Sequence, residues 1–196
     1  IDHVIIEGNQ LKGNSNGSNI KLFGSQNPEP TGRFLLKDNV IDSSIVTISY
    51  AAKAIVQGNT IKNCYNGYDA GLNLYNTNAV VENNTIKDHP TNGIKVSISS
   101  SFVNVVKDTI RSNTITGNNT DNSSNEGGIY ISDYGNPVIW YNDLHDNGYY
   151  DIYNITTGLD GNIDARFNWW GTTTTAEMNE GANPKNITRI YDYYDD

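Results

Sequence analysis

Lys95 is the residue of this sequence with the best case for a catalytic role. Its candidate partners are acids in neighbouring repeats: Asp69, Glu126 and Asp133. A lysine can abstract a proton from a sugar, provided that a positive charge also stabilises the adjacent carboxylate. The three acids form no tight motif, so solvated surface charges explain them better. We therefore predict no catalytic residue outright and keep Lys95 and Asp133 as alternative catalytic residues.

Three other chemistries have weaker support. Glycoside hydrolysis needs two carboxylates that face each other across the sugar, and Asp133 with Asp151 would be a pair without a motif. The single cysteine, Cys64, has no matching histidine motif, so a small buried or half-buried residue is expected. The histidines lie in distant repeats and predict no shared metal site: His3, His89 and His145.

The elements that must position these residues repeat along the chain. Each repeat is marked by an asparagine that follows a β-rich segment and stands two residues before a large apolar or aromatic side chain. The asparagines are spaced 20 to 30 residues apart, which suits one solenoid coil with turns of variable length. They are Asn9, Asn39, Asn59, Asn84, Asn113, Asn142 and Asn168.

A second strand-like segment follows most of these asparagines and alternates apolar with polar residues, as in the pairs Ile20 with Leu22 and Leu72 with Leu74. Because equivalent residues recur once per coil, like should stack on like in parallel strands about 4.8 Å apart. The asparagines then form a ladder of side-chain amides at the bend. The sequence therefore predicts an all-β parallel β-helix of about seven coils.

The V-x-x-N-x-I repeat resembles that of right-handed parallel β-helices in the pectate-lyase-like superfamily. The similarity covers nearly the whole chain and includes a terminal Asn168-Trp169-Trp170-Gly171 motif before an acidic, tyrosine-rich segment, as in secreted carbohydrate-associated and cell-surface proteins. The resemblance implies a right-handed solenoid and an extracellular or cell-surface location. Superfamily members that cleave uronic-acid polymers use acidic calcium ligands with a lysine or arginine base, so calcium is implied only for a lyase.

The two ends of the chain are expected to differ. We place the β-helix at residues 1–171 and a capping segment at 172–196. Asn183 and Pro184 suit the start of a helix, and helical spacing follows at Ile187, Ile190, Tyr191 and Tyr194. The first residues are strand-like, without a leader-like segment, so we expect a mature or excised piece whose first coil is covered by an upstream segment or a partner.

The outward face of the second strand is the candidate binding surface. Aromatic rings can cover the C–H face of a sugar, while lysine and asparagine can bind hydroxyls or carboxylates. Ordinary strand-compatible surface remains the competing interpretation. The candidate glycan-binding residues are Lys21, Asn73, Tyr75, Lys95, Tyr130, Tyr134 and Tyr153.

Charge and composition narrow the partners further. A net charge of −9 disfavours nucleic acid, and no apolar run is long enough to span a membrane. Candidate N-glycosylation sites are Asn16, Asn118, Asn122, Asn154 and Asn186. Asn118 and Asn122 occur in the longest turn and are expected to be the most accessible of these.

A further column could support assembly. The residue four before each repeat asparagine is apolar in most coils and would point outward: Ile5, Leu35, Ile55, Val80, Thr109, Val138 and Asp164. An exposed apolar stripe would favour self-association or packing against an adjacent domain. The alternatives are exposed β-branched strand formers, or a register shifted by one residue that makes this column core.

The leading hypothesis is thus a non-catalytic extracellular β-solenoid with a structural, adhesive or assembly role at a cell surface. Binding of a polysaccharide or cell-surface glycan is a further expectation, without a cofactor. The alternative hypothesis is a carbohydrate-active enzyme, specifically a polysaccharide lyase acting on uronic-acid polymers.

Overall fold

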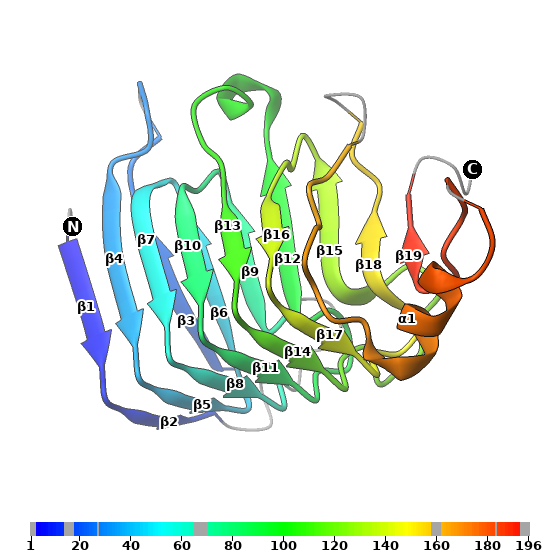
Figure 1. Ribbon diagram of the computed structural model, residues 1–196. Helices are drawn as coiled ribbons and strands as arrows, with labels where there is room; N and C mark the ends of the chain where they lie inside the picture. Colours follow the sequence, from blue (N-terminus) through cyan, green and yellow to red (C-terminus); the bar gives the residue numbers. More distant parts are fainter. Residues whose placement is uncertain are drawn as a thin grey trace.

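The computed structural model of the chain describes residues 3–13, 18–26, 28–64, 70–157, 162–182 and 184–192. The described chain winds into a parallel β-solenoid with three sheets, A, B and C (Figure 1). Each strand pairs in parallel with the equivalent strand of the next coil. The winding is right-handed, which is the usual hand of connections between parallel strands (Figure 1).

The three sheets have short strands. Sheet A consists of β1 (His3–Glu7), β4 (Gly32–Lys37), β7 (Ala51–Gln57), β10 (Ala79–Glu82), β13 (Thr109–Arg111) and β16 (Val138–Trp140). Sheet B consists of β2 (Gln10–Lys12), β5 (Val40–Asp42), β8 (Thr60–Lys62), β11 (Thr85–Lys87), β14 (Thr114–Thr116) and β17 (Asp143–His145). Sheet C consists of β3 (Ser18–Phe23), β6 (Ser44–Ser49), β9 (Leu72–Tyr75), β12 (Ile94–Ile98), β15 (Gly127–Asp133), β18 (Tyr150–Asn154) and β19 (Ile190–Tyr191).

One continuous core runs along the axis of the solenoid. Alternation within each strand turns one set of side chains inward, and these sets stack in register from coil to coil. In sheet C the inward column is buried and comprises Val46, Leu72, Ile94, Ile129 and Ile152. The same core cluster extends to Trp170, with Met178 and Ile190 packed against it, so the capping segment is part of the core.

The predicted asparagine ladder is present at the turn between sheets A and B. Asn84 is typical: its side-chain amide donates to Asn113 Oδ1 at 2.9 Å, and its Oδ1 accepts from the amide of Asn59 at 3.0 Å. The same pattern links all the marking asparagines from Asn9 to Asn168. Ladder asparagines between these ends are buried, and the ladder bonds supply partners for their polar groups.

The residue before each ladder asparagine has a left-handed backbone conformation. Glycine holds this position twice, and other residue types hold it in the remaining coils: Gly8, Asp38, Gly58, Asn83, Ser112, Tyr141 and Phe167. This conformation is unfavourable for bulky side chains. The ladder bonds of the following asparagine therefore help to hold a turn that the local sequence alone would not favour.

The coil count is slightly lower than expected. Six coils contribute a strand to all three sheets, so five stacking steps separate the first complete coil from the last. The seventh repeat forms only isolated bridges, at Asp164 and Trp169, before the chain enters α1 (Gly171–Asn179). The prediction of about seven coils was wrong to this extent, because the last marked repeat turns into the cap.

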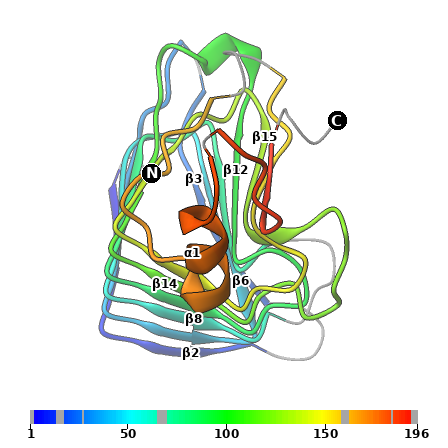
Figure 2. The same cartoon turned by 45° about the vertical axis from the view of Figure 1, so that its right-hand side comes forward.

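The cap contains a short helix, but not where its spacing predicted one. Helix α1 lies against the C-terminal end of the stack (Figure 2). Ile190 and Tyr191 instead form β19, which pairs in parallel with β18 and extends sheet C. Ile190 packs on the core in register with Ile152, and this packing favours a strand over the expected helix. Asn183 and Tyr194 lie outside the described residues.

Candidate functional site on the outer face of sheet C

The outer face of sheet C carries two columns of side chains in register. The first runs from Lys21 to Tyr153 in the order expected from the repeats, and strand pairing adds Tyr191 at its end: Lys21, Thr47, Asn73, Lys95, Tyr130, Tyr153 and Tyr191. The second lies two residues further along each strand: Phe23, Ser49, Tyr75, Ser97 and Ser132. Polar and aromatic groups thus recur in seven strands along the first column and in five strands along the second.

Part of this face is hollowed into a depression of about 420 Å³, which we call the sheet C groove. The described residues that line it are Asn19, Lys21, Phe23, Thr47, Asn73, Leu74, Tyr75, Lys95, Ser97, Ser132 and Asp133. Four of the predicted glycan-binding residues therefore meet here, namely Lys21, Asn73, Tyr75 and Lys95. Phe23 and Tyr75 are large exposed aromatics in the groove.

Lys95 lies between the groove and a patch of tyrosines. Its Nζ is 5.3 Å from the centroid of the Tyr130 ring, within the range of a cation–π contact. Burial, together with the charge of Asp121, raises the pKa of the Glu126 carboxyl, whereas the Lys95 ammonium lowers it. Burial and the neighbouring groups Tyr153, Asp133 and Glu126 raise the pKa of Tyr130.

The groove floor contains an amide oxygen without a partner. Asn73 is mostly buried and its side-chain nitrogen donates to Ala70 O at 3.0 Å, while its Oδ1 has no hydrogen-bond partner among the described residues. Beside it, the Ser97 hydroxyl donates to Asp133 Oδ2, and the Ser132 hydroxyl lies 3.3 Å from the same oxygen. Asn73 Oδ1 is itself buried, so this oxygen has neither a partner among the described residues nor an exposed surface in the groove.

A stack of tyrosines continues the first column toward the cap. The Tyr153 ring centroid is 5.6 Å from that of Tyr130 and 4.7 Å from that of Tyr191. Tyr150 packs against Tyr153 at 5.3 Å, so Tyr153 itself is mostly buried. We did not predict Tyr150 or Tyr191 as site residues. The Ile-Tyr pair at 129–130, 152–153 and 190–191 is the sequence signal that could have placed Tyr191 in this column.

Tyr134 does not belong to the groove. It packs against a small separate cluster of Ile98, Phe102 and Val106, where the chain leaves sheet C through the η1 turn (Ser100–Phe102). Asp133 has a left-handed conformation and β15 ends there, so Tyr134 lies just beyond the strand, as the sequence indicated, but its ring packs in this cluster and does not line the groove.

The glycosylation candidates differ in exposure. Asn118 is only 1% exposed and donates to Asn147 Oδ1 and Ile86 O, so the expectation of an accessible site there was wrong. Asn154 is also buried. Asn122 and Asn186 are exposed and stay predictions, while Asn16 lies outside the described residues.

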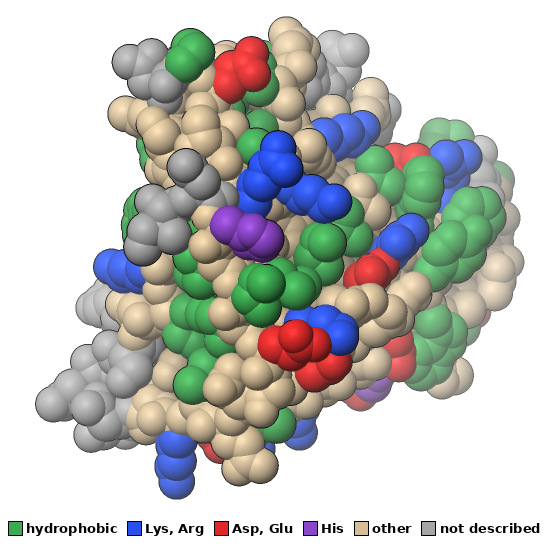
Figure 3. Space-filling view, turned by 90° about the vertical axis from the view of Figure 1, so that its left-hand side faces the viewer, with side chains coloured by type: hydrophobic (Ala, Val, Ile, Leu, Met, Phe, Trp, Pro, Cys, Tyr) green, Lys and Arg blue, Asp and Glu red, His purple; other side chains and the backbone are tan. Residues whose placement is uncertain are grey.

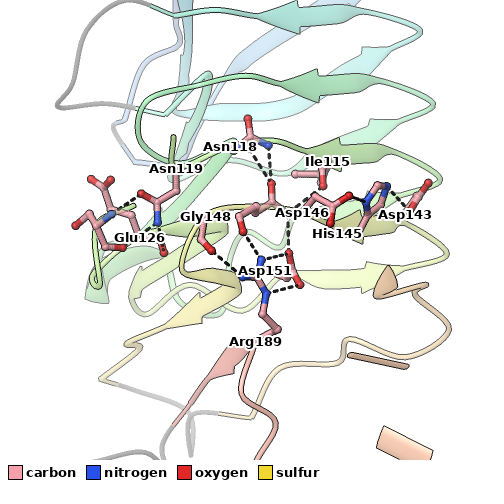
Figure 4. A network of polar contacts seen from close by, with 12 residues as sticks. Ile115, Asn118, Asn119, Glu126, Asp143, His145, Asp146, Gly148, Asp151 and Arg189 are labelled. Carbon is pink, nitrogen blue, oxygen red and sulfur yellow. Dashed lines mark hydrogen bonds and ion pairs between the residues drawn. The ribbon is translucent and has the colours of Figure 1, made fainter. Parts of the chain in front are cut away.

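Asn118 is buried because it belongs to a second ladder, which the sequence analysis missed. The His89 backbone N–H donates to Asn118 Oδ1, and Asn118 donates in turn to Asn147 Oδ1 at 2.9 Å. Asn147 then donates to the buried carboxylate of Asp151 at 2.8 Å. Arg189 completes the network, 3.1 Å from Asp151 Oδ1 (Figure 4). Asp151 is therefore part of a structural network at the cap.

The alternative catalytic residues occupy one end of the groove, since both Lys95 and Asp133 line it. Asp133 is the one carboxylate among the described lining residues, and the described chain has no cluster of three or more metal-binding side chains. Calcium prefers six to eight oxygen ligands, usually with several carboxylates. These residues do not fit a calcium site of the kind that the superfamily resemblance implied for a lyase. Asp69 lies outside the described residues.

The three histidines lie apart from one another, each in a different environment. His89 is buried, and its Nδ1 accepts a hydrogen bond from the Cys64 backbone N–H at 3.0 Å. His145 lies between Asp143 and Asp146, at 3.3 Å and 2.7 Å (Figure 4). His3 is exposed on β1.

Stacked parallel coils, two side-chain ladders and a polar, aromatic groove define a parallel β-solenoid repeat protein. The chain belongs to the family described as protein of unknown function (DUF1565), whose model matches residues 1–181. The searches of curated proteins and of solved structures gave no match. The described chain has no helix with the length and apolar character needed to cross a membrane.

Proposed function

We propose that this β-solenoid binds a polysaccharide in the sheet C groove and has an adhesive or assembly role at a cell surface. The observation that supports this is the run of Asn73, Lys95 and Tyr130 in successive strands beside an open depression. Coils advance by about 4.8 Å, so successive residues of an extended sugar chain would meet successive coils. Phe23, Tyr75 and Tyr130 offer rings for the C–H faces, and the ammonium groups of Lys21 and Lys95 offer donors for hydroxyl or carboxylate groups.

Binding assays with a panel of neutral and uronic-acid polysaccharides test this proposal. Tyr75→Ala and Lys95→Ala should each weaken binding to the preferred polymer by about tenfold, the equivalent of about 1.4 kcal/mol. Tyr141→Ala is the matched control, because Tyr141 is exposed at the opposite turn, next to the asparagine ladder. Equal losses in all three variants, or no binding by the parent protein, would contradict the groove.

The second candidate function is a polysaccharide lyase, which the shared position of Lys95 and Asp133 in the groove favours. β-Elimination of a uronic-acid polymer creates a carbon–carbon double bond that absorbs ultraviolet light. Turnover that disappears in Lys95→Ala but persists in Lys12→Ala, a lysine of sheet B, would assign catalysis to the groove and overturn the non-catalytic proposal.

A further inference from the structure

Sheet A carries a line of basic and amide side chains on its outer surface, which we call the sheet A basic column. It begins with His3, Arg33 and Lys53, which occupy equivalent positions in successive strands. Asn78, Lys107 and Asn136 follow in the next three coils and line a depression of about 370 Å³ beneath the turn at Asn104 and Val105. Figure 3 shows basic side chains gathered beside a histidine at this end of the molecule, next to a band of hydrophobic side chains.

The basic column is not neutralised by the protein itself. Within the described chain, Arg33, Lys53 and Lys107 are exposed and take part in no ion pair or side-chain hydrogen bond. Four residues further along the chain, by contrast, the cations are neutralised by acids. Lys37 pairs with Glu7 at 2.8 Å, and Arg111 pairs with Glu82 at 2.6 Å. A chain of net charge −9 has ample acids for pairing, yet this column stays free of them.

We propose that the sheet A basic column binds an extended, carboxylate-bearing polysaccharide, at a surface separate from the sheet C groove. The strands set one side chain about every 4.8 Å along a line, which suits a polymer with one carboxylate per sugar unit. Arg33 and Lys53 supply charge, and Arg33 can bind a carboxylate with two hydrogen bonds. The amides of Asn78 and Asn136 can bind hydroxyl or carboxylate groups in the coils that have no cation.

The apolar stripe beside the column contributes a second contact. Ile5, Leu35 and Ile55 lie two residues along the strands from the basic residues and face outward, with Ile5 57% exposed. Such side chains can cover the C–H surface of a sugar ring. A DNA duplex suits this face less well, because its phosphates are spaced more closely than the coils and the protein carries a net charge of −9.

The test compares two double variants with the same change in net charge. Arg33→Gln with Lys53→Gln removes two cations of the column, while Lys12→Gln with Lys87→Gln removes two cations of sheet B. Binding to polygalacturonate is measured by calorimetry at low and high salt, with the carboxyl-reduced polymer as the neutral ligand. We expect the sheet A double variant to lose about tenfold in affinity and part of its salt dependence, and the sheet B variant to change less than twofold.

Each other outcome overturns the proposal in a recognisable way. Equal losses of affinity in both double variants would indicate a general charge effect. If the carboxyl-reduced polymer bound as tightly as polygalacturonate, the carboxylates would not be what the column recognises. Duplex DNA bound as tightly as polygalacturonate would change the ligand class. Loss of an oligomer in the sheet A variant, with polymer binding intact, would assign the face to a second copy. Loss of binding in Lys95→Ala alone would leave the sheet C groove as the site and refute the sheet A column.

Discussion

Single asparagines hold the turns of this solenoid, and each one serves several backbone groups. Asn84 Nδ2 lies within hydrogen-bond distance of Val56 O, Glu82 O and Asn113 Oδ1, and its Oδ1 accepts from the Asn59 backbone and side chain. Loss of one ladder amide therefore leaves polar groups without partners in two neighbouring coils. The buried position makes each of these losses costly.

Asn84→Leu should lower the free energy of unfolding by about 1–3 kcal/mol, because buried donors and acceptors lose their partners. Asn9→Leu is the control, since Asn9 is exposed at the end of the ladder and has a ladder neighbour on one side only. Thermal and denaturant melting measure both variants. An unchanged midpoint for Asn84→Leu would contradict a stabilising role for the ladder.

Asp108 makes the stability of the protein depend on pH. It is fully buried beneath β10 and β13, and burial raises its pKa to about 7, although hydrogen bonds from Thr77 and Ala79 act in the opposite direction. Because the folded-state pKa lies above the unfolded value near 4, the folded protein binds one more proton between these values. Stability from this group is present below pH 4 and is lost as the pH rises toward 7.

Asp108→Asn should remove this contribution to the pH dependence. Asparagine keeps an oxygen for Thr77 and Ala79 but carries no charge, so the variant should lose less stability than the parent between pH 4 and pH 7, by as much as a few kcal/mol. Denaturant melts at several pH values measure the difference between the two proteins. Parallel stability curves would show that Asp108 does not titrate in this range.

At the scale of elements, the sequence predicted the sheets better than the cap. Repeated asparagines and alternating strands were sufficient to predict the coils and the register of the sheet C columns. The second ladder was missed because only Asn118 and Asn147 are asparagines, and His89 occupies the equivalent place in the preceding coil. Helix α1 was missed because its run of threonines is poor in helix formers, so packing rather than propensity decides its fold.

The candidate site was likewise predictable where it depends on the repeats and not where it depends on side-chain packing. Register in sheet C followed from the repeats, so Lys21, Asn73, Tyr75 and Lys95 could be predicted as one surface. Side-chain packing around the turns could not be inferred from spacing, so the packing of Tyr134 away from the groove and the burial of Tyr153 were not foreseen. The strand formed by Ile190 and Tyr191 depends on the exposed edge of β18, a feature of the assembled stack.

Arg189 should be important for holding β19 on the stack. It contacts the buried Asp151 carboxylate at 3.1 Å and donates to Gly148 O at 2.7 Å. Arg189→Ala should cost about 2–3 kcal/mol, since it removes a partner of a buried charge. Arg166→Ala is the control, because Arg166 makes a bidentate pair with Asp164 at the surface and should cost less than about 1 kcal/mol.

Hydrogen exchange is the measurement that distinguishes a local from a global effect of Arg189→Ala. Amide protection should fall first in β18 and β19, because Tyr191 and Tyr153 lose their fixed contact. Equal melting temperatures for the Arg189 and Arg166 variants would contradict a special role of the buried pair.

At the scale of the whole molecule, neighbouring residues of a sheet A strand face opposite sides of the sheet, one toward solvent and the next toward the core. Ile55 points outward beside the basic column, whereas Val56 is completely buried in the core. Ile55→Lys should therefore leave the melting temperature within a few degrees of the parent, and Val56→Lys should prevent stable folding. Circular dichroism and light scattering measure folding and mass, and a loss of mass in folded Ile55→Lys would support assembly through the apolar stripe. A collapsed melt for Ile55→Lys would contradict the outward register.

The two asparagine ladders also give the solenoid an electrical direction. Every linking amide donates toward the next coil and accepts from the one before, so the side-chain dipoles point the same way and add along the axis, as peptide dipoles do in a helix. The donor end of such a row is partially positive and favours an anion. The second ladder meets this condition with Asp151, whose carboxylate accepts from the last amide, Asn147. The buried acid at the cap thus terminates an aligned row of dipoles, in the way that an aspartate terminates a helix at its first turn.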